Sequence, residues 1–198
     1  MEMADYSLEK TIAEAGIHYP RSYDIAYRWG YVLQSIGALI LASFYFFKIP
    51  YEFAGIVIFD IGIALSSMFL LVWKASIKRF ILWCTFSGIA VQLLSLLPIP
   101  VSEKIFLIGL GLTLAGGAGL VGKEAYCFGF IEGWLLFFAY PIVLLANLFG
   151  MPSHSLNSAF FALIAFLQLS FLRKKLRQPL LKGCESNICV VAKGKEKD

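Results

Sequence analysis

Long apolar runs separated by short polar joints are the feature that most constrains this chain. Each run approaches the ~20 residues that a helix needs to cross a lipid bilayer. Hydrocarbon offers no hydrogen-bond partners, so a chain inside it must satisfy its backbone groups internally. The pattern therefore predicts an all-α, polytopic membrane protein with six transmembrane helices. The predicted spans are residues 30–47, 53–73, 80–97, 105–121, 125–149 and 156–172.

Composition agrees with this class. Hydrophobic residues make up 59% of the chain and charged residues 15%, whereas soluble domains carry about 25% charged residues. The formal net charge of +4 comes from basic residues at the ends of apolar runs, so it does not indicate a nucleic-acid partner. We expect a polar tail with a short helix over residues 1–27, a transmembrane domain over 28–173 and a basic tail over 174–198.

The basic residues are distributed unevenly between the two predicted sides. Of the 17 Lys and Arg residues, only Lys48 and Lys104 fall on one side. All the others fall with the two tails, the joint at 74–79 and Lys123. Because basic loops stay in the cytoplasm, we expect both termini to be cytoplasmic.

A repeat of low similarity is visible in the turns. Proline-bearing turns at Pro50, Pro98 and Pro152 are spaced by about 50 residues. This spacing is typical of three copies of a helical hairpin. It is equally the length of any two spans with their two turns, so both interpretations stay open.

Glycine and other small residues concentrate in one stretch, residues 109–134. Ala115 and Gly119 are spaced i, i+4, and so are Gly129 and Gly133. Small residues at this spacing let two transmembrane helices approach closely. We expect these four residues to make a tight contact between the fourth and fifth spans.

Four residues are candidates for a functional polar site: Asp60, Glu124, Cys127 and Glu132. A charged residue at the centre of a span costs about 2.5–3.5 kcal/mol on insertion scales. Asp60 is therefore either a proton or cation ligand or a neutral carboxyl bonded to a neighbouring helix. Glu124 and Cys127, at i, i+3, are expected to share a helical face. Glu132 is expected two turns further along the same fifth span.

Each candidate also has a structural interpretation. Glu124 can pair with Lys123 or sit as an acidic residue in the first turn of a helix. Cys127 and Cys84 are candidates for membrane redox chemistry, although buried thiols are usually inert. Cys184 and Cys189 do not make a zinc site by themselves, because zinc takes four ligands. We expect no metal, no cofactor and no catalytic residue.

A basic stretch follows the sixth span directly. Its charges are typical of a segment that attracts anionic lipid head groups, each worth about 1 kcal/mol. The residues expected to do so are Arg173, Lys174, Lys175 and Arg177.

Residues 123–128 read KEAYCF, and Glu132 and a long apolar run follow them. This hexapeptide and its setting, with the span count over residues 25–175, resemble a family of small bacterial and cyanobacterial integral membrane proteins with no assigned activity. The resemblance implies a membrane location and a helical architecture, and it implies no catalytic role. We therefore expect a multi-pass protein of the bacterial inner (cytoplasmic) membrane or a related energy-transducing membrane.

Two functions are compatible with these features. The first is a non-enzymatic accessory or assembly protein that packs against a membrane protein partner or itself, since the loops are too short to hold a soluble active site. The second is a small proton- or cation-linked permease or channel that uses the intramembrane carboxylates. The permease predicts that Asp60 and Glu132 meet at a wet cavity, whereas the accessory protein predicts carboxyls bound in helix–helix contacts.

Overall fold

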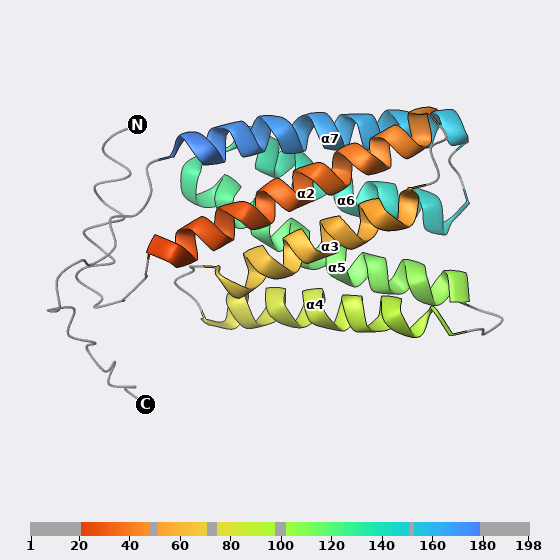
Figure 1. Ribbon diagram of the computed structural model, residues 1–198, viewed down its shortest axis with the longest axis horizontal. Helices are drawn as coiled ribbons and strands as arrows, with labels where there is room; N and C mark the ends of the chain where they lie inside the picture. Colours follow the sequence, from red (N-terminus) through yellow and green to blue (C-terminus); the bar gives the residue numbers. More distant parts are fainter. Residues whose placement is uncertain (1–20, 48–50, 71–74, 98–101, 151–152, 179–198) are drawn as a thin grey trace, which may run out of the picture.

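The computed structural model describes residues 21–47, 51–70, 75–97, 102–150 and 153–178. Every regular element in these ranges is a helix, which confirms the all-α class. The helices run along one common direction as a bundle, with α2 and α7 side by side (Figure 1). They are α2 (Arg21–Phe47), α3 (Glu52–Met68), α4 (Ala75–Leu94), α5 (Ser102–Phe128), α6 (Ile131–Leu148) and α7 (His154–Arg177).

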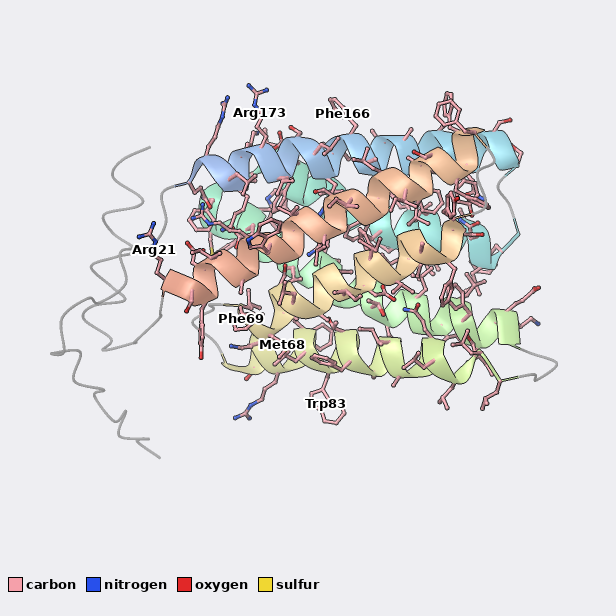
Figure 2. All side chains as sticks on the ribbon, viewed as in Figure 1. Arg21, Met68, Phe69, Trp83, Phe166 and Arg173 are labelled. Carbon is pink, nitrogen blue, oxygen red and sulfur yellow. The ribbon has the colours of Figure 1, made fainter. Side chains whose placement is uncertain are left out.

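Five of these helices, α2, α4, α5, α6 and α7, are long and apolar enough to cross a membrane. The remaining helix, α3, has 17 residues and so extends for about 25 Å at 1.5 Å per residue. Large apolar side chains cover the outside of the bundle. Trp83 is 75% exposed and Phe166 68% exposed, and both point away from the helices (Figure 2). Such a surface suits lipid acyl chains.

The boundary predicted between the fourth and fifth spans is wrong. Lys123 and Glu124 do not interrupt a helix, because α5 continues through them to Phe128. The break comes at Gly129, whose φ of 68° lies in the left-handed region that glycine adopts without strain. Charged residues near a helix end need not terminate it when their charges are paired inside the bundle.

The first span also differs from its predicted bounds. Helix α2 begins at Arg21, nine residues before the expected start of the span, and it crosses the expected domain boundary at 27/28. The short helix expected within residues 1–27 and the tail after residue 178, with Cys184 and Cys189, lie outside the described residues.

Helices α2 and α3 touch through glycines. A Cβ atom on Gly62 would lie 2.6 Å from the Gln34 backbone nitrogen and 2.7 Å from the Gly30 carbonyl oxygen. Beside this contact, the Gln34 amide donates to Ser66 Oγ at 3.2 Å. The two backbones are therefore in direct contact, and a polar pair lies next to it.

Helices α4 and α5 repeat this arrangement. A Cβ atom on Gly109 would lie 2.7 Å from the Gln92 backbone nitrogen and 2.9 Å from the Gly88 carbonyl oxygen. The Gln92 amide donates to Thr113 Oγ1 at 2.9 Å. In both hairpins the first helix carries Gly-x3-Gln and the second carries Gly-x3-Ser or Gly-x3-Thr. This shared geometry favours the repeated-hairpin interpretation for two of the three copies.

The four residues expected to join the fourth and fifth spans have different surroundings. Gly133 does pack on α5, where a Cβ would lie 2.7 Å from the Val121 carbonyl oxygen. Gly119 faces Ile81 of α4 instead, and Ala115 is exposed. Gly129 has no neighbour within 4 Å of a Cβ position, because it lies in the turn. The predicted contact therefore exists, but of the four residues only Gly133 makes it.

Candidate functional site

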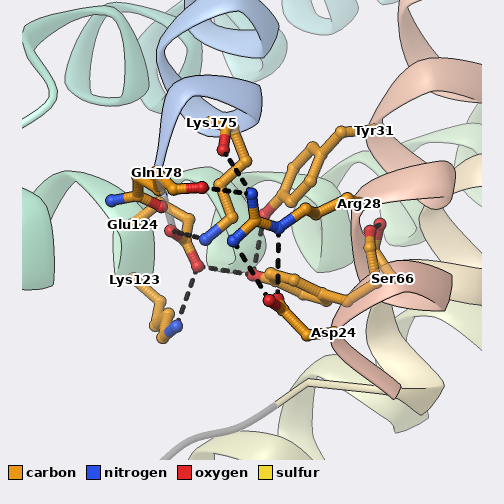
Figure 3. A network of polar contacts seen from close by, with 9 residues as sticks. Asp24, Arg28, Tyr31, Ser66, Lys123, Glu124, Lys175 and Gln178 are labelled. Carbon is orange, nitrogen blue, oxygen red and sulfur yellow. Dashed lines mark hydrogen bonds and ion pairs between the residues drawn. The ribbon is translucent and has the colours of Figure 1, made fainter. Parts of the chain in front are cut away.

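A buried cluster of charged side chains lies where α2 begins and α7 ends (Figure 3). Its centre is Glu124, near the end of α5, which is fully buried. Glu124 Oε1 accepts hydrogen bonds from the Tyr27 hydroxyl at 2.6 Å and from Lys123 Nζ at 2.8 Å. Glu124 Oε2 accepts one from Lys175 Nζ at 2.7 Å. Donors from α2, α5 and α7 thus converge on one carboxylate.

Aromatic rings enclose the two ammonium groups of this cluster. The Nζ atoms of Lys123 and Lys175 lie 4.9 to 5.6 Å from the ring centroids of Tyr27 and Phe128. Cations over aromatic rings at this distance are stabilised by the ring quadrupole, more strongly where water is excluded. The Tyr27 hydroxyl also shares a 2.9 Å hydrogen bond with the Tyr31 hydroxyl, which extends the polar group toward the centre of the bundle.

Arg28 connects the cluster to the end of α7. Its guanidinium pairs with Asp24 at 3.0 Å, one turn away on α2. The same group donates to the Lys175 carbonyl at 3.2 Å and to the Gln178 carbonyl at 2.6 Å. The last carbonyls of a helix have no partner within it. Arg28 therefore caps α7 from a neighbouring helix.

The cluster is closed and carries one positive charge more than its negative charges. Two carboxylates, Asp24 and Glu124, meet three cations, Arg28, Lys123 and Lys175. Removing one member of a buried ion pair leaves an uncompensated charge, so such groups are held together strongly. Both Glu124 oxygens accept hydrogen bonds from the protein, and the carboxylate is therefore committed to contacts between helices.

Glu132 makes a second, more exposed contact with α7. It lies in the first turn of α6, not on the helix that carries Glu124. Its two oxygens accept hydrogen bonds from Ser170 Oγ at 2.9 Å and from Lys174 Nζ at 2.7 Å. Because the Lys174 side chain is 45% exposed, this pair is partly solvated and contributes less than the Glu124 pairs.

Glu124 and Cys127 were predicted to share a helical face, but their side chains lie in different environments. Glu124 is fully buried, whereas Cys127 is exposed. Both Cys127 and Cys84 are free thiols. Within the described ranges, no group of three or more His, Cys, Asp and Glu side chains is arranged to hold a metal ion.

Asp60 lies apart from the other candidates, at the α3–α4 side of the bundle. It lines a groove between these helices together with Gln92, and it is 7% exposed. Asp60 and Glu132 therefore do not meet at one cavity, contrary to what a carboxylate-based permease predicts. The four predicted site residues therefore lie in four different environments.

A chain of uncharged polar side chains crosses the middle of the bundle. Gln168 Nε2 donates to Gln34 Oε1 at 3.3 Å, and the Tyr140 hydroxyl donates to Gln168 Oε1 at 3.1 Å. Tyr140 also lines a cavity of about 110 Å³, which Tyr45, Glu52 and Asn147 border as well. These polar residues link α2, α6 and α7 at the depth of the apolar core.

Sequence reasoning assigned Lys175 to the lipid head groups, and this is wrong, because the Lys175 side chain is 5% exposed. The exposed residues of that stretch are Arg173, Lys174 and Arg177. Gln168, Phe171 and Lys175 are buried at i, i+3 and i+7, which is a helical period. This period was the signal that could have identified Lys175 as an inward-facing residue. Tyr27 was missed because Glu124 is 97 residues away, and Arg28 because the carbonyl groups that it caps lie on the distant α7.

The bundle, with its lipid-compatible surface and paired internal charges, defines a multi-pass integral membrane protein. The chain belongs to a family of uncharacterized integral membrane proteins (DUF2301), whose model matches residues 61–184, more than half of its length. No curated protein and no solved structure matches the chain. This membership confirms the predicted membrane class. It also confirms the predicted resemblance to a family of integral membrane proteins that has no assigned activity. The bacterial source and the KEAYCF signature remain predictions.

Proposed function

We propose that this protein is a non-enzymatic accessory or assembly protein that packs against a membrane protein partner or against a second copy of itself. The observation that supports this proposal is the pairing of both carboxylates at the basic end. Glu124 is held by Lys123 and Lys175, and Glu132 is held by Lys174 and Ser170. Carboxylates bound in this way strengthen the bundle and are not positioned to carry an ion.

We further propose six spans with both termini in the cytoplasm, in the bacterial inner membrane or a related membrane. The support is the position of the basic residues. Arg28 and Lys175 contact each other at one end of the bundle, and Lys123 lies there too. In the same topology Arg173 and Arg177 face the anionic head groups of the cytoplasmic leaflet.

Affinity capture tests the accessory role. The tagged full chain is extracted in a mild detergent, captured and identified with its bound proteins by mass spectrometry. The expected result is a stoichiometric complex or a defined oligomer. A matched capture with an unrelated tagged membrane protein of similar size removes background. A monomer with no bound protein, both in detergent and after cross-linking in native membranes, would contradict the proposal.

The permease remains the second candidate, because one observation favours it. The 110 Å³ cavity reaches Tyr140, and Tyr140 connects through Gln168 to Gln34. A proton-linked route along this chain predicts proton uptake into proteoliposomes that the Gln168→Leu variant abolishes. Proton flux at the background level in both the wild type and the variant would rule out this route.

A further inference from the structure

We infer that the groove between α3 and α4 binds a transmembrane helix of another protein, and that this helix presents a lysine or arginine to Asp60. The inference rests on the accessory function proposed above. It adds the place of contact and the chemistry of the partner.

The groove lies on the outside of the bundle. Helix α3 packs closely on α2, and α4 packs closely on α5, while the groove of about 330 Å³ separates α3 from α4 over part of their length. Its walls are apolar, and Ile61, Met68 and Leu93 are each more than half exposed. An apolar hollow of this shape in a membrane surface accommodates the side chains of another helix.

Asp60 gives the groove its specificity. The Asp60 residue is only 7% exposed, and its Oδ1 atom has no hydrogen-bond partner among the described residues. Gln92 is its polar neighbour and a hydrogen-bond partner of the carboxyl group, and the Gln92 Nε2 atom also donates to Thr113. An amide carries no charge, so it does not supply the cation that the carboxylate lacks. Glu124 and Glu132, by contrast, both have lysine partners. A carboxyl at this depth without a cation is costly, and a basic side chain from outside would compensate it.

Two further acidic residues border the hollow next to this groove. A second hollow of about 510 Å³ shares Phe53, Ile56 and Phe106 with the groove and is bordered by Glu52 and Glu103. A helix in the groove would therefore meet carboxylates at two depths. This distribution is complementary to a helix with one basic residue inside the membrane and others at its end.

The described helices of a second copy of this chain do not offer the required side chain. In the described helices the basic residues lie near the helix ends, and Arg28, Lys123 and Lys175 are already paired inside the bundle. A metal ion is also a poor match, because the groove walls are apolar and only Asp60 contributes a carboxylate to them. The observations therefore favour a helix of a different protein.

Synthetic helices test the inference directly. The full chain is reconstituted in phosphatidylcholine vesicles with a dansyl-labelled, leucine-rich transmembrane peptide that carries one central lysine. The matched peptide carries leucine at that position. Energy transfer from the tryptophans of the protein, among them Trp83 on α4, reports association. We expect the lysine peptide to bind about tenfold more tightly than the leucine peptide, from the strength of polar contacts between model transmembrane helices.

Three variants locate the contact. Asp60→Asn should remove the preference for lysine, whereas Glu132→Gln, the same change outside the groove, should keep it. Ala64→Phe, which fills the groove, should weaken both peptides. Retained helicity and thermal stability show that each variant is folded. Equal binding of the two peptides to the wild type, or an unchanged preference in Asp60→Asn, would overturn the inference.

The same variant separates this inference from the proposed function. Capture of one partner by the wild type and by Asp60→Asn alike would leave the accessory role standing and refute the groove as its site. Capture that Asp60→Asn abolishes, with the fold intact, would support both. A wild type that is monomeric and captures no partner would refute the accessory role independently of the peptide result.

Discussion

The Glu124 carboxylate and the Lys175 ammonium lie 2.7 Å apart, although 51 residues separate them in the chain. The Glu124 side chain is fully buried and the Lys175 side chain is 5% exposed. This pair ties the end of α5 to the end of α7, while Tyr27 brings α2 to the same carboxylate. The end of the bundle richest in charge is therefore also one of its most closed regions.

The buried pair should matter more than the exposed pair beside it. We predict that Lys175→Met lowers the free energy of unfolding by about 3 kcal/mol, because it leaves Glu124 buried with one cation fewer. Lys174→Met removes a 45% exposed partner of Glu132 and should cost no more than about 1 kcal/mol. Denaturant titration in detergent micelles measures both. Equal losses in the two neighbouring variants would contradict the assignment.

The glycine contacts predict which small residues are indispensable. Gly62→Ala and Gly109→Ala place a methyl group against backbone atoms at 2.6 and 2.7 Å, so each should destabilise the bundle by about 1–3 kcal/mol. Gly111→Ala is the matched control. Its Cβ would meet only the end of the Leu144 side chain, which can move. The gain in helix propensity, about 1 kcal/mol, should make this control neutral or stabilising.

The turn between α5 and α6 depends on backbone conformation alone. Gly129 has a φ of 68° and open space around it. Gly129→Ala should therefore cost about 1–2 kcal/mol through backbone strain and nothing through packing. Gly129→Asn should cost less, because asparagine tolerates the left-handed region. Unfolding titrations of the two variants should show losses of stability in this order. An alanine variant as stable as the wild type would show that the backbone of this turn does not require glycine.

Cys127 provides a test of orientation. It is exposed and lies at the end of the bundle that carries the basic cluster. In a variant with Cys84, Cys184 and Cys189 changed to Ser, a membrane-impermeant maleimide should label Cys127 only after the cells are permeabilised. Glu103→Cys in a cysteine-free background, at the opposite end, should be labelled in intact cells. The reverse labelling would place the basic end outside the cytoplasm.

The fold class could be predicted from the sequence because the bilayer imposes it. Apolar runs of the right length have few alternatives to a helix that crosses the membrane. The bounds of α5 and α6 were predicted less well. Considered as isolated charges, Lys123 and Glu124 look like a polar segment between two spans. The position that breaks the helix is Gly129, only five residues later.

The candidate site could be predicted only in part. Glu124, Glu132 and Asp60 stood out because carboxyls are rare within apolar runs. Their surroundings were not visible, since Glu124 binds side chains 51 and 97 residues away. Lys175 was misplaced for the same reason, because a basic stretch after a span indicates lipid contact until the helix face is known.

The amino-acid sequence by itself determined that this chain is a helical membrane protein, since the cost of an unpaired backbone group in hydrocarbon leaves almost no other structure. The tertiary structure alone decided which acids are satisfied. Glu124 and Glu132 have lysine partners from α7, while Asp60 faces a groove with one oxygen unbonded. The physical reason is that pairing depends on how the helices are rotated and crossed, and glycine contacts between distant segments set that geometry.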